Sequence, residues 1–340
     1  VQLRAALGEA RVQDARRGDS DGGLLWLRLD HVASERFRQE YELNRYGRDL
    51  QLSDLGYLPR ADLTQLRARH TWYTRSWPEA SRVRDSAWNS QLLWQRNGAG
   101  ERVYASWELQ HRWSLRSAAE LSLFAVVAAP YVDDLVLRGN GSVRLPSQHV
   151  IGAFYESPRL GDWRFDIEVD AYQEGLSGWA RELEFTPTWF IGERFSTSLY
   201  AGYVDSSDWL IWDGGNRLGR YTRRQAEFDW TLEWFPRPRH ELRLRAQYVG
   251  LRARALDGYA VSAGRLQEAS SPADFSLGTL AAQIRYRYEI GAQRDFYLVL
   301  SRGGDYFGED AEASGLDRLF DRTRANETAN QILAKLRWGF

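Results

Sequence analysis

The chain has 340 residues, 14% of them aromatic, and a mean hydropathy of -0.55. It contains no cysteine, which excludes disulfides, a thiol nucleophile and a cysteine-based metal site. The formal net charge of -1 gives no support for nucleic acid or an anionic surface as a partner. No run of about 18 apolar residues occurs, which excludes membrane-spanning helices.

Taken in chain order, the sequence predicts strands of about ten residues, the length that a tilted membrane-spanning strand needs. We count about sixteen such segments, and about fourteen or eighteen strands would fit the same boundaries. The expected strands lie near residues 2–12, 23–33, 35–46, 62–75, 85–96, 101–113, 118–128, 147–156, 161–173, 179–190, 195–205, 222–235, 239–254, 277–290, 294–303 and 328–340.

Apolar and polar residues alternate within many of these segments, so that each strand has one apolar and one wet face. In the strand near 161–173, for example, the apolar residues Trp163, Phe165 and Ile167 alternate with charged residues. The alternative is a soluble β-sandwich whose aliphatic faces form the core. The opposite faces carry so many charges that we favour a transmembrane barrel with lipid on its apolar side.

The connections between the expected strands alternate in length. Short links fall at 33–34, 114–117, 157–160, 191–194, 236–238 and 291–293, and long ones at 13–22, 47–61, 129–146, 206–221, 255–276 and 304–327. This alternation is typical of the periplasmic turns and extracellular loops of outer-membrane barrels. It predicts an all-β, transmembrane, antiparallel up-and-down β-barrel over residues 1–340, in a Gram-negative outer membrane, with its C-terminus on the periplasmic side.

The two ends of the chain add to this expectation. Apolar residues of one parity fill the last strand, and the chain ends on an aromatic, as a barrel-closing strand does; these residues are Ile332, Ala334, Leu336, Trp338 and Phe340. Val1 opens directly on a strand-like segment with no signal peptide, so we expect an exported N-terminal part to precede these residues.

The wet parity predicts the lining of the lumen. Acids are expected on one arc, formed by Asp166, Glu168, Asp170, Glu182, Glu184, Glu227, Asp229 and Glu233. Bases are expected on the next arc, formed by Arg243, Arg245, Arg285, Arg287, Lys335 and Arg337. Opposed walls of charge select polar solutes in pores. The alternative is that these charges pair across neighbouring strands and fill a plugged lumen.

No catalytic or metal-binding pattern emerges. The five histidines are scattered, and a Ser-His-acid site is recognised by geometry that the sequence does not give. We therefore predict no enzyme, no cofactor and no metal site, with a barrel enzyme acting on lipid as a weaker alternative. Trp209 and Trp212, in the expected loop at 206–221, could stack on a sugar, although an aromatic belt is the favoured interpretation.

Three stretches resemble a family of Gram-negative outer-membrane proteins. They are residues 281–304 (AAQIRYRYEIGAQRDFYLVLSRGG) with the closing QILAKLRWGF, residues 54–63 (DLGYLPRADL), and residues 242–260 (LRLRAQYVGLRARALDGYA) with 274–276. That family joins an N-terminal periplasmic module, similar to carbohydrate-binding module family nine, to a barrel domain of unknown function. The module is absent from this chain, and Trp338-Gly339 stands where the family suggests a Tyr-Arg pair.

Together these observations predict a pore or transport conduit for a polar solute or polymer, with carbohydrate as the candidate class. The loops at 255–276 and 304–327 are expected to fold inward as a gate. The alternative is a closed structural or binding barrel that anchors the periplasmic module without conduction. The expected partners are outer-membrane lipid, lipopolysaccharide, the barrel-assembly machinery and a periplasmic module or protein, but no nucleic acid.

Overall fold

The computed structural model describes residues 1–12, 20–50, 60–309 and 315–339, and within them the chain forms nineteen strands and one helix. The strands of the first half are β1 (Gln2–Val12), β2 (Ser20–Ser34), β3 (Phe37–Tyr46), β4 (Leu63–Thr74), β5 (Val83–Asn97), β6 (Arg102–Leu115), β7 (Glu120–Ala128), β8 (Tyr131–Asp133), β9 (Val143–Leu145) and β10 (Gln148–Glu156). The second half contains β11 (Trp163–Glu174), β12 (Gly178–Ile191), β13 (Phe195–Trp212), β14 (Arg217–Trp234), β15 (His240–Ser262), β16 (Arg265–Ala269), β17 (Phe275–Gly291), β18 (Arg294–Gly308), α1 (Leu316–Ala325) and β19 (Glu327–Trp338).

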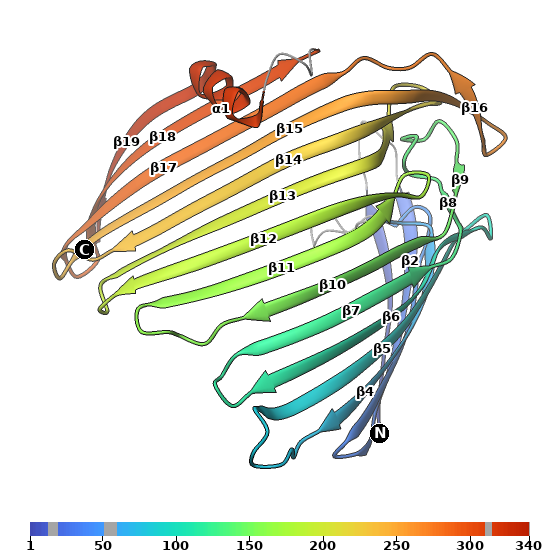
Figure 1. Cartoon of the computed structure of the whole chain (residues 1–340), viewed down its shortest axis with the longest axis horizontal. Coiled ribbons are helices and arrows are strands. Elements are labelled where there is room, and N and C mark those ends of the chain that lie inside the picture. The colour runs from blue at the N-terminus through green and yellow to red at the C-terminus, as the bar shows by residue number, and fades with distance from the viewer. Residues whose placement is uncertain (13–19, 51–59, 310–314, 340) are drawn as a thin grey trace.

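Seventeen strands form one antiparallel sheet in which sequence neighbours pair (Figure 1). Pairing runs from β1 to β7, then to β10, because β8 and β9 form a separate two-stranded ribbon. It continues from β10 to β15 and on through β17, β18 and β19. The short β16 pairs with the last part of β15. The all-β, up-and-down antiparallel arrangement predicted from the alternation is therefore present.

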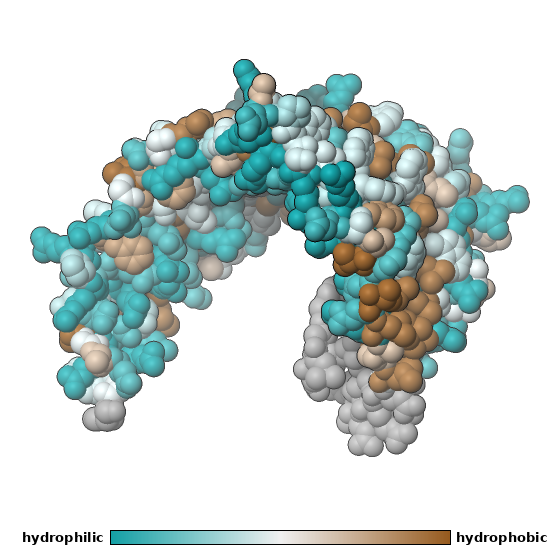
Figure 2. Space-filling view, turned by 90° about the horizontal axis from the view of Figure 1, so that it is seen from below, coloured by the Kyte–Doolittle hydropathy of each residue, from teal (hydrophilic) through white to brown (hydrophobic). Residues whose placement is uncertain are grey.

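The sheet is strongly curved but open. Figure 2 shows an arch with a hollow beneath it, and no described residue of β1 pairs with a described residue of β19. The closed barrel expected from the sequence is thus met only in part. Phe340, the last residue of the expected closing strand, lies outside the described residues, as do residues 54–59 of the stretch that resembles the outer-membrane family.

The two faces of the sheet differ as the alternation predicts. In β12, Leu183 and Phe185 are exposed on one face, whereas Glu182 and Glu184 lie on the other and are more covered. The more covered, charged face is the concave one. A groove of about 750 Å³ on the apolar face crosses β1 to β7. Its lining includes Leu27, Leu43, Leu66, Leu92, Trp107 and Val127. Figure 2 shows an apolar patch on one arm of the arch.

We call the strand ends at which β1 begins and β19 finishes the terminal end of the sheet, and the opposite ends the rim (Figure 1). At the rim, two predicted loops are wrong. Residues 206–221 are mostly strand, because β13 and β14 extend to eighteen residues each and only 213–216 turn. Likewise β15 runs for 23 residues and turns tightly into β16, so little of 255–276 is loop.

The connection between β7 and β10 folds onto this extended part of the rim. Leu137, Val143 and Leu145 are buried against Leu218 and Val261, which belong to β14 and β15. The backbone N–H of Arg144 also donates to the carbonyl of Gly264 at 3.1 Å. The β8–β9 ribbon is therefore anchored to the opposite part of the rim by an apolar cluster.

Helix α1 lies on the convex face over β15, β17 and β18 (Figure 1). Its apolar stripe faces the sheet, where Leu319 and Thr323 are fully buried and Phe320 packs edge-on against Tyr248 at 5.0 Å. The expectation that 304–327 folds inward as a gate is therefore wrong for the helical part. The physical reason is the spacing of Leu316, Leu319, Phe320 and Thr323, which builds a helix with one face suited to the outside of the sheet.

This packing predicts an effect for Gly304→Val in β18. A Cβ at Gly304 would lie 2.3 Å from the carbonyl oxygen of Thr323, so the backbone of α1 would have to move. We expect a loss of about 1–3 kcal/mol in the free energy of unfolding, and faster amide hydrogen exchange across α1. Gly291→Ala is the matched control, because a Cβ there meets no atom within 4 Å. Unchanged exchange in the Gly304→Val protein would contradict the packing.

Candidate functional site

The concave face of β11 to β14 carries five carboxylates in register. Asp170 lies opposite Glu182, and Glu168 lies opposite Glu184 on the same pair of strands. Glu184 is followed across β13 by Gly202, which is opposite Glu227 of β14. We call these five carboxylates, which belong to the predicted acidic arc, the acidic surface: Glu168, Asp170, Glu182, Glu184 and Glu227.

The acidic surface is not neutralised by bases. Among the described residues none of its five carboxylates forms an ion pair, and the nearby pairs go instead to Asp166, Glu174 and Asp229. Tyr200 donates a hydrogen bond to Glu184 at 2.8 Å, and the amide of Gln225 donates to Glu227. A concave wall of one sign attracts cations and repels anions from solution.

The predicted basic arc is arranged differently. Arg245 pairs with Asp229 at 2.8 Å, and Arg243 pairs with Glu233 at 3.3 Å, both across β14 and β15. Ion pairs across neighbouring strands, the alternative considered from the sequence, therefore hold on this side of the sheet. Lys335 and Arg337 share the same face of β19, where they lie opposite Tyr297 and Asp295.

Glu241 is the centre of this paired region, and the sequence did not single it out. It is buried and receives Arg285 at 3.4 Å and Arg287 at 3.6 Å, together with Arg243 of its own strand. Arg287 also pairs with Asp295 at 2.9 Å. The strand alternation could have predicted its position, because Glu241 lies on the same face of β15 as the arginines two and four residues later.

A further polar surface occupies the concave face of β4 to β6. Side-chain amides link the strands: Arg69 donates to Gln91 at 2.8 Å, Gln91 to Glu108 at 3.2 Å, and Asn89 to Gln110 at 3.3 Å. These five residues line a cavity of about 200 Å³. Amide groups both donate and accept hydrogen bonds, so this surface suits an uncharged, hydroxyl-rich solute.

The structure separates the two tryptophans that were predicted in one loop, and both lie in β13. Trp209 belongs to an aromatic cluster with Tyr221 and Phe275, and the guanidinium of Arg223 lies 5.2 Å from its ring. Trp209 is half-buried in this cluster, so only part of its ring is accessible, and the sugar-stacking role stays a prediction.

Trp212 borders a cavity of about 550 Å³ at the rim, between β5, β6, β8 and β13. Its indole N–H donates to the carbonyl of Gly215 at 2.9 Å, and Arg138 covers its ring at 4.4 Å. Tyr131 of β8 lines the same cavity, and burial, with Asp133 acting in the same direction, raises the pKa of its phenol to about 12. Its hydroxyl is therefore a neutral donor at ordinary pH.

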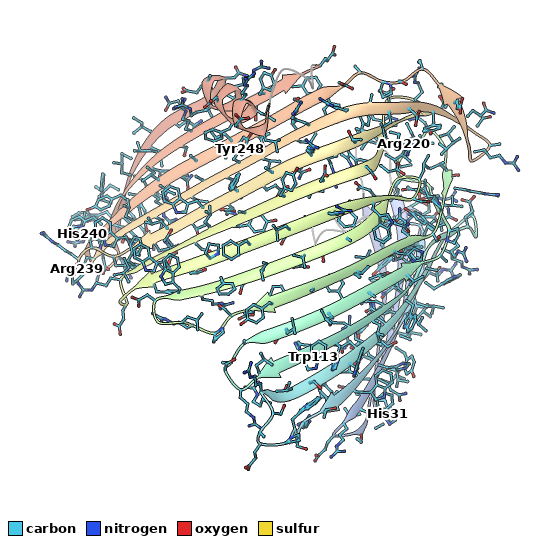
Figure 3. The ribbon with its side chains drawn as sticks, viewed as in Figure 1. His31, Trp113, Arg220, Arg239, His240 and Tyr248 are labelled. Carbon is cyan, nitrogen blue, oxygen red and sulfur yellow. The ribbon has the colours of Figure 1, made fainter. Side chains whose placement is uncertain are left out.

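Three of the histidines are parts of aromatic stacks at the terminal end of the convex face. His111 stacks on Trp88 at 3.9 Å, and His240 stacks on Tyr288 at 4.7 Å. His70 lies edge-on to Trp72 at 5.9 Å. Figure 3 shows Trp113 and His240 at this end, whereas Arg220 lies near the rim. These histidines are far apart on the sheet, so they do not converge with acids on one catalytic site.

Two negative findings concern the described part of the chain. No group of three or more His, Asp and Glu side chains is placed to hold a metal ion there. That part also contains no helix with the length and apolarity needed to cross a membrane.

No protein-family model matches the chain, and no curated protein sequence matches it. A structure described as a bacterial polysaccharide outer membrane secretin is 7% identical, over 90% of this chain and 93% of that chain, with a TM-score of 0.39. The siderophore receptor PirA from Acinetobacter baumannii is 10% identical, over 94% of this chain and 63% of that chain, with a TM-score of 0.40. A loop-deletion mutant of OmpT, an outer membrane protein of Vibrio cholerae, is 10% identical over 91% and 94%, with a TM-score of 0.35.

Proposed function

We propose that the chain is a transmembrane β-barrel of a Gram-negative outer membrane, closed by pairing of β1 with β19, and that its concave face lines a conduit for a polar solute. The observation that carries the proposal is the division of the sheet into an apolar convex face and a charged concave face. Carbohydrate, which the sequence resemblance suggests, is the candidate class of solute.

The convex face supports a lipid environment. Large apolar side chains are exposed on strand after strand: Leu66, Leu92, Trp107, Val127, Ile151, Val169, Leu183, Phe228, Ile284 and Leu300. Water-soluble monomers rarely expose a continuous apolar surface of this size. In a bilayer the same surface is buried, and only a sheet closed on itself can satisfy its backbone there.

An aromatic girdle at the terminal end also supports membrane insertion. On the convex face, Trp163 stacks on Trp189 at 5.4 Å, and Phe37 stacks on Trp72 at 5.0 Å. Together with the stacks around His111 and His240, these rings mark one level across the sheet. Aromatic rings of this kind collect at the boundary between lipid tails and water.

The free edges support closure. Leu7 of β1 is 82% exposed and Ile332 of β19 is 75% exposed, compared with 40% for Leu199 in the middle of the sheet. Both edge strands place these side chains on the convex face. β1 begins at the terminal end of the sheet and β19 finishes there, so the two strands are antiparallel to each other. Antiparallel pairing would therefore cover both rows and satisfy both backbones.

The concave face supports conduction of a polar or cationic solute. The acidic surface draws positive charge, and the amides of β4 to β6 can exchange hydrogen bonds with hydroxyl groups. A second candidate is a closed barrel that anchors a periplasmic carbohydrate-binding module. It is favoured by bulky concave-face side chains, such as Phe124, which would sit 2.4 Å from a Cβ built at Gly152.

Single-channel conductance in planar bilayers tests the conduit. We expect steady openings that favour cations, and we expect Glu184→Gln with Glu227→Gln to lower the cation preference severalfold, because two uncompensated charges are removed. The control is Glu233→Gln, whose carboxylate is already paired with Arg243 at 3.3 Å. Inserted protein that stays silent at all voltages would contradict the conduit and favour the anchor.

A further inference from the structure

Arginines also collect on the convex face, where they serve no part of the proposed lumen. Arg181, Arg224, Arg252 and Arg254, which we call the basic row, line a concavity of about 560 Å³ near the rim. Three of them are in register across four strands: Arg181 lies opposite Asp205, Asp205 opposite Arg224, and Arg224 opposite Arg252. The remaining lining residues are Trp179, Ser206, Ser207 and Thr222.

Arg224 has only a weak anionic partner in the basic row. Its pair with Asp205 is 3.3 Å long and exposed on both sides. A pair so exposed contributes little. Among the described residues, Arg181 and Arg254 form no ion pair, and both are exposed. Adjacent strands lie about 4.8 Å apart, so one bound anion can contact guanidinium groups on neighbouring strands.

The basic row lies at the edge of the apolar band of the convex face. The next row toward the terminal end consists of Leu183, Tyr203 and Ala226, so the arginines stand directly at the edge of the apolar band. Along β14, eleven residues run from Arg224 to Trp234, an exposed aromatic residue at the end of that strand. This is close to the length of about 9–11 residues that crosses the hydrocarbon core. The basic row is therefore at the level of the headgroups on the rim side.

We propose that the basic row binds the phosphate groups of a sugar-headed lipid in the outer leaflet. This inference rests on the proposed membrane placement. Arginine forks match phosphate oxygens with paired hydrogen bonds, and the hydroxyl of Thr222 offers a further donor. Trp179 is exposed at the side of the concavity, where its ring can cover the sugar or the upper part of an acyl chain.

Native mass spectrometry of the purified full chain in detergent tests the site, with bisphosphorylated lipid A as the probe. We expect Arg181→Gln with Arg254→Gln to weaken binding at least about tenfold, since two charge-assisted contacts are lost. The matched control is Arg243→Gln with Arg245→Gln, which removes the same charge from the concave face. Equal binding by wild type and the convex-face variant would overturn the site, as would equal weakening by the control.

Two further experiments are needed. The first distinguishes a lipid phosphate from free phosphate as the ligand, and the second distinguishes failure of the lipid site from failure of the proposed barrel. Lipid A without phosphates is expected to bind weakly, and inorganic phosphate is expected to compete only at far higher concentration; strong competition by phosphate would overturn the lipid site in favour of a free anion. Insertion is measured separately, as heat-modifiable, protease-protected protein in liposomes. If wild type inserts while the variants bind lipid A equally, the site fails and the barrel stands. If wild type does not insert, both proposals fail.

Discussion

A disulfide between β1 and β19 is expected to form in membranes when one cysteine is placed on each strand. The chain has no cysteine of its own, so any intramolecular link reports on the two introduced residues. Ala334 of β19 and Ala5 of β1 both face the convex side, and neither substitution changes charge. Because closure fixes the register, cysteines at Leu3, Ala5 and Leu7 are each combined with Ala334→Cys.

The yield of the cross-link should be either nearly complete or very low for each cysteine pair. A disulfide needs Cα atoms within about 7 Å, so we expect one combination to cross-link almost completely under mild oxidation and its neighbours to react poorly. The readout is a mobility shift on electrophoresis that reductant reverses. Ala5→Cys with Ala282→Cys in β17 is the matched control and should remain reduced. Folded, heat-modifiable protein in which no combination reacts, or only links between chains appear, would mean that the sheet stays open.

Asp208→Ala is expected to produce the largest loss of stability among single substitutions at the rim. Asp208 of β13 is 1% exposed, and its carboxylate accepts the backbone N–H groups of Leu176 and Gly178 at 3.0 and 2.8 Å. It also pairs with Arg220 at 2.7 Å, and Arg220 continues to Asp257 of β15 at 2.8 Å. One carboxylate thus ties together the β11–β12 turn, β13 and β14.

Removing that carboxylate leaves two part-buried N–H groups without an acceptor and takes from Arg220 one of its two carboxylate partners, which costs about 3–5 kcal/mol. The measurement is the urea midpoint of the tryptophan fluorescence change in detergent, with the slope checked for constancy. Asp205→Ala is the comparison, because its exposed pair with Arg224 should contribute less than about 1 kcal/mol. Equal midpoints for the two variants would show that the buried network does not hold the rim.

Alternation made the strands and their faces predictable. Glu182 and Glu184 share a face because they are two residues apart in one strand. The placement of charged residues on one side of the sheet could therefore be predicted from the sequence. Pairing of β1 with β19 would be a contact between residues more than three hundred positions apart, and the pattern of either strand specifies only an apolar face. Closure therefore remains a proposal.

The rim was harder to predict because its polar residues are satisfied by partners distant in sequence. Asp208, Gly214 and Gly215 suggested a loop, yet Arg220 and two backbone N–H groups neutralise and bind the aspartate, and the strand continues. Glu241 was overlooked for the same reason, since its role arises from arginines on three positions of two strands. The helical spacing in α1 was present in the sequence but was hidden inside a long connection.

Strand length in this sheet varies in a way that affects how a solute would arrive. β7 and β10 have nine residues each, whereas β15 has 23. At about 3.3 Å per residue, one side of the wall is less than half as tall as the other. The mouth of the proposed conduit is therefore an inclined plane, and an elongated solute lying along the tall side is already parallel to the strands before it descends to the acidic surface.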